Sequence, residues 1–209
     1  MYYKSNFSIL FFFGLIIILP FIGIFSKVNY DLNLFFDFFQ NSYTHRLIYF
    51  SVYQAFVSAI LSCFLAIPFA LALNRHKDLK IIKFIISLCG FCFVIPTILI
   101  VYAVIKLYGN NGFYNSYFNL YEYLSIETIF GIKAILIAHT LLNTPFATRL
   151  FFQSLNSIPL KYYEISSSLN ITFFGNLLKL EMPYIRQNFF TVFSIIFSLC
   201  FLSFAIVMA

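Results

Sequence analysis

Five apolar runs, each long enough to cross a bilayer as a helix, constrain this chain more than any other feature of its sequence. The runs are 7–25, 49–73, 81–108, 129–152 and a fifth that begins near Phe189. A membrane helix needs about 20 residues, and lipid offers no partner for unpaired backbone groups. Hydrophobic residues make up 62% of the chain and charged residues only 10%, so a soluble domain is excluded. The sequence predicts an all-α integral membrane protein, a bundle of about five transmembrane helices.

The charge and cysteine patterns exclude several classes of site. The net charge is +6, but the thirteen Lys and Arg residues are scattered around the apolar runs and form no basic stripe for nucleic acid. The C-x-x-C spelling Cys89–Cys92 lies inside an apolar run with no second pair and no nearby His. Metal or redox chemistry needs accessible thiolates, so small-residue packing is the better interpretation. We expect no nucleic-acid partner, no metal, no cofactor and no catalytic residues.

The basic residues also predict the orientation in the membrane. With the N-terminus inside, the cytoplasmic set is the larger one: Lys4, Arg75, Lys77, Lys80, Lys83, Arg149, Lys161, Lys179 and Arg186. Cytoplasmic loops carry an excess of such residues. The sequence therefore predicts a multi-pass protein of the cell inner membrane with a cytoplasmic N-terminus. In this arrangement Asn74–Asp78 reads as a solvated cytoplasmic turn, and Glu164–Pro183 also lies in the cytoplasm.

The segment Glu164–Pro183, EISSSLNITFFGNLLKLEMP, is a polar island between two apolar runs. Its apolar residues recur at roughly helical spacing, which predicts amphipathic helices. Asn170 is suited to the left-handed conformation that ends a helix. Thr172 can accept the free N–H groups that start the next helix. We predict two short helices with a bend between them, forming a knob that fits a socket on a soluble partner.

The spacing in this segment resembles the loop by which the membrane subunits of ABC-type importers dock onto their ATPase. That family carries Glu-Ala-Ala, a glycine six residues after the Glu, and a Leu-Pro ending. Here Glu164 matches the Glu, Ile165-Ser166 stands for the alanines, Asn170 replaces the glycine and Met182-Pro183 stands for Leu-Pro. The resemblance implies an ATPase coupling loop with these key residues: Glu164, Ser166, Ser167, Leu169, Asn170 and Pro183. The alternative is an interfacial helix pair that only caps the bundle.

Upstream, AHTLLNTPFATRLFFQSLNSIP (138–159) looks like the corresponding span of the bacterial thiamine and thiamine pyrophosphate importer permeases, which are binding-protein-dependent inner-membrane components. Members of that family are long chains with two such halves in tandem. The resemblance implies a first half, with an anchor and external loop at 1–48 and a truncated permease transmembrane domain at 49–209. It also implies these partners: a cytoplasmic ABC ATPase subunit, a periplasmic substrate-binding protein, and a second permease half or copy in the lipid bilayer.

Neutral polar residues and prolines in the spans mark a candidate translocation path: His139, Asn143, Pro145 and Pro96. His139 and Asn143 are one turn apart and share a helix face. Polar groups at membrane depth face the bundle or a wet cavity. Interhelical hydrogen bonding that only holds the bundle together is an equal alternative. Pro96 in the third run is either a gate hinge or an inert kink, and the sequence does not separate the two.

Three other functions stay open at this stage. The thiamine permeases resemble the iron(III) permeases, so iron(III) is an alternative cargo; the loop tyrosines Tyr114, Tyr117, Tyr121 and Tyr123 keep it open. An intramembrane enzyme is less favoured because the chain lacks Gly-x-Ser-x-Gly, His-Glu-x-x-His and paired intramembrane carboxylates. A secondary transporter usually has acidic groups within its spans, and none is visible. The chain also has no phosphate-binding Gly-x-x-x-x-Gly-Lys-Ser/Thr loop, so ATP must be hydrolysed by a separate subunit.

Overall fold

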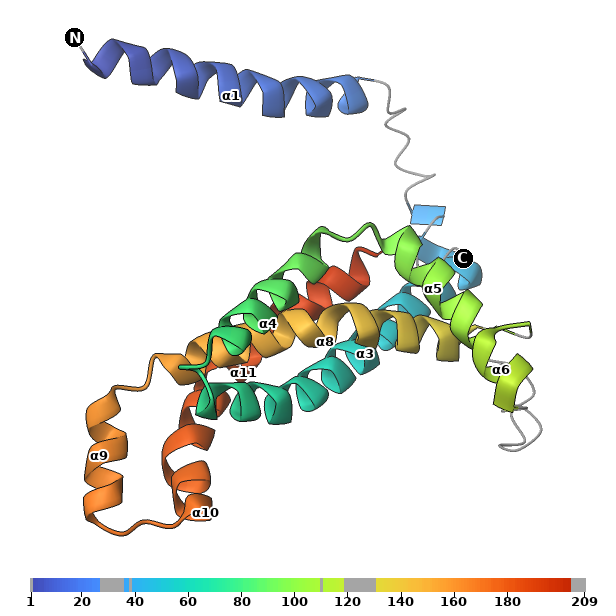
Figure 1. Ribbon diagram of the computed structural model, residues 1–209. Coiled ribbons are helices and arrows are strands. Elements are labelled where there is room, and N and C mark those ends of the chain that lie inside the picture. Colours follow the sequence, from blue (N-terminus) through green and yellow to red (C-terminus); the bar gives the residue numbers. More distant parts are fainter. Residues whose placement is uncertain (1, 27–35, 38, 110, 119–130, 204–209) are drawn as a thin grey trace. The chain divides into compact units, whose positions relative to one another are not determined.

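The computed structural model describes residues 2–26, 36–37, 39–109, 111–118 and 131–203 (Figure 1). Every regular element in these residues is helical, which confirms the all-α class. The chain divides into two compact units, 1–47 and 48–209. In the first unit, α1 (Tyr2–Phe25) is a single apolar helix that contains Pro20, and its side chains from Phe11 onward are almost all exposed.

The second unit is a helical bundle. Its first residue, 48, lies within helix α3 (Ser42–Arg75). The elements that follow are α4 (Lys80–Phe91), the 3-10 turn η1 (Cys92–Val94), α5 (Thr97–Tyr108), α6 (Phe113–Phe118), α8 (Ile132–Asn156), α9 (Leu160–Ser168), α10 (Phe173–Asn176), the π-helical turn η2 (Leu177–Glu181) and α11 (Met182–Phe201). Helix α8 is central and packs against α4, α5 and α11 (Figure 1).

The core of this unit is built on small residues of α3. Its buried face is a stripe of Ala55, Ala59, Cys63, Ala66 and Ala70, each with no exposed surface. This stripe joins one cluster with Phe151 of α8 and Ile196 of α11. Small residues let helix backbones approach closely, which is how membrane helices pack.

The outer face of α3 carries the large side chains instead. Phe64 and Phe69 are 64% and 58% exposed. A helix with small residues inside and bulky apolar residues outside is suited to lipid rather than water, because water would drive the large side chains inward. The two helices that are long and apolar enough to cross a membrane, among the residues described, are Ser42–Arg75 and Phe173–Phe201. The predicted number of five spans remains a prediction.

The third predicted span is not one helix. Helix α4 ends at Phe91, η1 follows, and Ile95 and Pro96 are extended with ψ of 126° and 128° before α5 begins at Thr97. Proline disfavours the helical conformation of the residue before it, which explains the break at Ile95. Each half is 12 residues, about 18 Å long, and so too short to cross the hydrocarbon by itself.

The fifth predicted span starts earlier than expected. Helical structure is continuous from Phe173 to Phe201, whereas hydropathy had placed the start near Phe189. The prediction was wrong here because charged residues precede Phe189 and Pro183 was read as an ending. Pro183 is the second residue of α11 and follows directly on the π turn η2, inside this continuous helix. Before it, η2 widens the helix, and the Met182 N–H donates to the Leu177 carbonyl five residues back.

Candidate functional site

A helical hairpin leaves the bundle at one end of α8 and α11. Helices α9 and α10 run side by side and form a projection at the lower left of Figure 1. We call residues 160–183 the hairpin. Its second arm differs from the prediction, since α10 is no separate helix but continues through η2 into α11. The hairpin is therefore joined to the bundle by a continuous helix on one side and by a short connection to α8 on the other.

The predicted bend at residues 170–172 is confirmed. Asn170 has φ of 53°, and no other non-glycine residue described has a positive φ. The Asn170 N–H donates to the Ser167 carbonyl (3.1 Å) and the Ile171 N–H to the Ser166 carbonyl (3.0 Å). This pair of bonds is a Schellman motif, which satisfies the last carbonyls of α9. Thr172 then caps α10, since its hydroxyl accepts from the Gly175 N–H at 3.3 Å.

The predicted coupling residues divide into inward and outward groups. Ser166 is buried and its hydroxyl donates to the Asn176 side-chain oxygen, which joins the two arms. Glu164, Ser167, Leu169 and Asn170 are exposed. The hydroxyls of Ser167 and Ser168 turn back onto the Glu164 carbonyl, at 2.7 and 2.9 Å. The exposed group leaves one side of the hairpin available to a partner.

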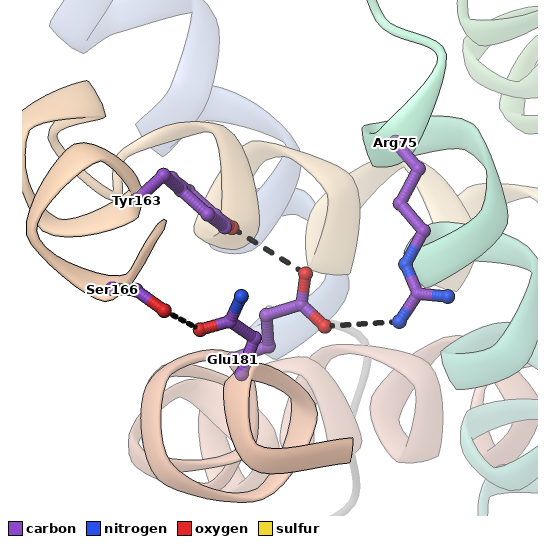
Figure 2. Close-up of polar contacts among 5 residues, drawn as sticks. Arg75, Tyr163, Ser166 and Glu181 are labelled. Atoms are coloured by element: carbon purple, nitrogen blue, oxygen red, sulfur yellow. Dashed lines mark hydrogen bonds and ion pairs between the residues drawn. The ribbon is translucent and has the colours of Figure 1, made fainter. Parts of the chain in front are cut away.

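A buried carboxylate holds the base of the hairpin to α3. Figure 2 shows Glu181 between Arg75 on one side and Tyr163 on the other. Arg75 Nη2 lies 3.3 Å from Glu181 Oε2, and the Tyr163 hydroxyl donates to Glu181 Oε1 at 3.5 Å. Glu181 is only 3% exposed, so these contacts replace the water that it has lost.

Two further features strengthen this base. The Arg75 guanidinium carbon is 3.7 Å from the centroid of the Phe173 ring, a cation–π contact with the start of α10. Burial and the Glu181 carboxylate raise the pKa of the Tyr163 phenol, so it remains protonated and can donate at neutral pH. Arg75, Tyr163, Phe173 and Glu181 thus tie α3, both arms and η2 together. We call these four residues the anchor cluster.

Sequence reasoning missed the anchor cluster. It treated Asn74–Asp78 as a solvated turn, whereas Asn74 is 6% exposed and Arg75 pairs with Glu181. The pairing spans 106 residues, which no local pattern reveals. One signal was available: Glu181 interrupts an apolar stretch, and an acid that becomes buried must find a partner.

The bundle holds a cavity of about 450 Å³ that is lined by both predicted polar residues of α8, His139 and Asn143. The other lining residues are Cys92, Ile95, Thr97, Leu142, Phe146, Leu199, Leu202 and Ser203. They come from η1, the break before α5, the first residue of α5, α8, the end of α11 and the two residues that follow it. Pro96 is exposed and lies between two lining residues, while Pro145 is half-buried in an uninterrupted α8 and does not line the cavity.

The polar groups around this cavity are mostly unpaired. Both ring nitrogens of the fully buried His139 lack a hydrogen-bond partner among the residues described, as do the Thr140 and Thr144 hydroxyls. Asn143 is an exception, because its amide donates to Cys200 Sγ at 3.2 Å. Interhelical hydrogen bonding that holds a bundle together needs paired groups. The Asn143–Cys200 contact between α8 and α11 is of that kind, whereas His139 makes none among the residues described.

Arg149 lies two turns along α8 from Leu142 and packs onto α4. Its guanidinium fills the space over Gly90 that a Cβ would occupy. Glycine at this position allows the close approach, in agreement with the packing interpretation of the Cys89–Cys92 segment. Among the residues described, no group of three or more potential metal ligands comes together.

Known proteins similar to this chain are permeases. The thiamine transport system permease protein ThiP of Haemophilus influenzae is 36% identical over 170 residues, covering 81% of this chain and 31% of the relative. The proteins of the same name from Salmonella typhimurium and Escherichia coli are each 33% identical over 173 residues, covering 81% of this chain and 32% of each relative. No protein-family model matches the chain.

These relatives confirm the resemblance predicted from the sequence. Over about four-fifths of its length the chain is similar to membrane permeases of thiamine transport systems. The chain spans about a third of the length of the curated relatives it matches.

Proposed function

We propose that this chain, a relative of the thiamine transport permeases, is part of the permease of an ATP-driven ABC importer that moves thiamine or thiamine pyrophosphate across the inner membrane. It acts with a separate ATPase subunit in the cytoplasm and a substrate-binding protein in the periplasm, and a second permease half completes the pathway. The main observation in support of this mechanism is the hairpin, which projects from the bundle. Its left-handed bend lies at Asn170, where the importer family has glycine.

The hairpin is suited to transmit movement because one arm continues into the bundle. Helical structure runs from Phe173 to Phe201 without interruption. At its far end, Leu199, Leu202 and Ser203 line the cavity. A displacement of the hairpin by the ATPase would therefore move the cavity wall, and the anchor cluster would carry the same movement to α3.

The cavity supports a translocation path in which the break at Ile95–Pro96 acts as the hinge. Unwound backbone at membrane depth is tolerated only where it is buried in protein or lines a cavity, and Ile95 lines one here. The path is neutral, because the lining residues include no Asp, Glu, Lys or Arg. A neutral path suits a cargo family that includes both a cation and its pyrophosphate.

Iron(III) is the second candidate cargo, and the geometry favours it less. A hard cation prefers oxygen ligands such as carboxylates or tyrosines, and the cavity lining contains neither. Of the tyrosines that kept iron open, Tyr114 and Tyr117 lie in α6, outside that lining. Tyr121 and Tyr123 lie outside the described residues.

The test of the proposed function is uptake of labelled thiamine and labelled iron(III) by cells with and without the full-length gene. We expect thiamine uptake to depend on the gene and iron uptake to be independent of it. In the same cells, Glu164→Lys should abolish thiamine uptake while the protein remains in the membrane, because it replaces an exposed carboxylate of the hairpin with a cation. Loss of iron uptake with intact thiamine uptake would refute the thiamine assignment, and full activity of the Lys variant would refute the docking role.

A further inference from the structure

His139 is a buried polar residue that lacks, in the described part of the chain, the hydrogen-bond partners that such residues usually have. It is fully buried in α8, and neither ring nitrogen has a hydrogen-bond partner among the residues described. A neutral imidazole offers one N–H donor and one acceptor nitrogen. Leaving a buried polar group unpaired is costly, and ionisable groups within membrane spans tend to be functional for this reason. Because the ring has no accessible surface in this structure, a molecule in the cavity supplies the missing partner when the imidazole turns toward it.

The cavity beside His139 has the size and composition of a ligand site. Its volume of about 450 Å³ lies within the ~300–1,000 Å³ usual for small-molecule pockets. Apolar side chains and the Phe146 ring form most of the wall, with a few polar groups: Cys92, Thr97, His139, Asn143 and Ser203. An apolar wall with a few convergent polar groups is the usual design of such pockets.

The polar groups on α8 share one chemical character. His139 presents a donor and an acceptor, and Asn143 retains its amide oxygen and one N–H after bonding to Cys200. An amide pairs bidentately with the edge of an aminated heteroaromatic ring, as Asn does with the amino group and ring nitrogen of adenine. An aminopyrimidine presents the same donor–acceptor edge. The lining has no charged residue to pair with a thiazolium or a pyrophosphate.

A second, independent feature is the broken helix that borders the same space. Ile95 and Thr97, on the two sides of Pro96, both line the cavity. Thr97 begins α5, whose N-terminus has no side-chain cap. Discontinuous helices surround substrate sites in many transporters because their free backbone groups can contact the cargo.

We propose that this cavity is a cargo-binding site within the membrane, in which His139 and Asn143 hydrogen-bond the aminopyrimidine edge of thiamine. The proposal rests on the proposed function and deepens it, since it names the part of the cargo that is recognised. The site binds the pyrimidine ring that thiamine and its pyrophosphate have in common. One neutral path can therefore transport both molecules.

The test measures binding of labelled thiamine to the complete permease, purified with its ATPase and without the substrate-binding protein. We expect His139→Ala to weaken binding about tenfold, the effect of one lost hydrogen bond. His139→Gln, which keeps a donor and an acceptor, should restore part of the affinity. Ser62→Ala is the matched control, because the Ser62 hydroxyl is also buried and unpaired but does not line the cavity; its binding should equal that of the wild type.

A thiamine analogue with a hydroxyl in place of the pyrimidine amino group tests recognition of the same edge from the ligand side, first with the wild type and then with His139→Ala. The wild type should bind this analogue about tenfold more weakly than thiamine, and His139→Ala should not weaken it further. Equal affinity for the two ligands in the wild type, or no thiamine binding by a complex that transports thiamine, would overturn this inference and leave the proposed function standing. If the wild type does not transport thiamine at all, the proposed function fails, and this inference fails with it.

Discussion

The hairpin and the cavity beside His139 lie at opposite ends of α11 and differ in how their buried polar groups are paired. In the hairpin, Glu181 has two partners and Ser166 bonds across to the other arm. At the cavity, His139 has no partner among the described residues, although it is equally buried. Paired polar side chains stabilise one arrangement of the helices, whereas a buried polar group without a partner can still form a hydrogen bond with a ligand.

This difference indicates a division of work along one helix. In the proposed mechanism the ATPase acts on the paired end, whose contacts hold it to α3. At the unpaired end, a ligand or a rearrangement of the cavity wall can lower the free energy of the protein by giving His139 a hydrogen-bond partner. Substitutions at the two ends should therefore fail in different ways: the hairpin variants in coupling, and the cavity variants in cargo affinity.

The largest effect is expected from Arg75→Glu, which would place two carboxylates side by side at the base of the hairpin. Removing one partner of a fully buried ion pair costs ~3–5 kcal/mol; nearly a third of the Arg75 side chain is exposed, so we expect a loss of about 2 kcal/mol, with added repulsion. Transport should fall by more than about tenfold, since each 1.4 kcal/mol corresponds to a factor of ten. Uptake is measured together with the amount of protein in the membrane.

The charge-swapped pair Arg75→Glu with Glu181→Arg is the matched control. If the ion pair matters as a pair, the swap should recover part of the transport that the single variant loses. Thiamine binding at the cavity should change little in either variant, because the anchor cluster does not line it. A single variant that transports normally would remove the distinction between the paired and the unpaired end.

Sequence reasoning predicted the local features of these regions well. The left-handed bend at Asn170 and the cap at Thr172 followed from side-chain chemistry that acts within a few residues. The shared face of His139 and Asn143 followed from helical periodicity, and both line one cavity. These features depend on neighbours in the chain, which a single sequence displays directly.

The features that the sequence did not predict depend on contacts between distant residues or on small differences in helix stability. The Arg75–Glu181 pair joins segments that only the packed bundle brings together. The fifth helix begins at Phe173, although charged residues and Pro183 interrupt the apolar pattern before Phe189. Pro96 was predicted to be either a gate hinge or an inert kink, and the choice stays a prediction; the structure adds that the helix is interrupted at Ile95 and Pro96.

A smaller effect is expected at the bend, where Asn170→Val tests whether the hairpin must hold its shape. A β-branched residue with φ of 53° is strained by about 1–2 kcal/mol. We expect a several-fold loss of transport with normal cargo binding. Asn170→Gly is the control, because glycine adopts this conformation freely and should transport as the wild type does. Equal activity of the two variants would indicate that the bend is not required for coupling.

The smallest effect is expected from Tyr163→Phe, which removes one long hydrogen bond to Glu181 and leaves the ion pair with Arg75 in place. A neutral donor at 3.5 Å contributes at the low end of the usual range, about 0.5 kcal/mol, so transport should fall less than threefold.

The pH dependence provides the sharper test. Because burial and Glu181 raise the pKa of the Tyr163 phenol, its contribution is complete below pH ~10, the ordinary pKa of tyrosine, and is lost only as the pH rises through the raised value. Below pH ~10 the thermal stabilities of the purified wild type and the Phe variant should differ by a constant amount. Above it the wild type should lose this advantage, since a phenolate would then face the Glu181 carboxylate. A difference that instead changes between pH 6 and pH 8 would show that another group at the base of the hairpin titrates, and that the paired end is less rigid than its contacts indicate.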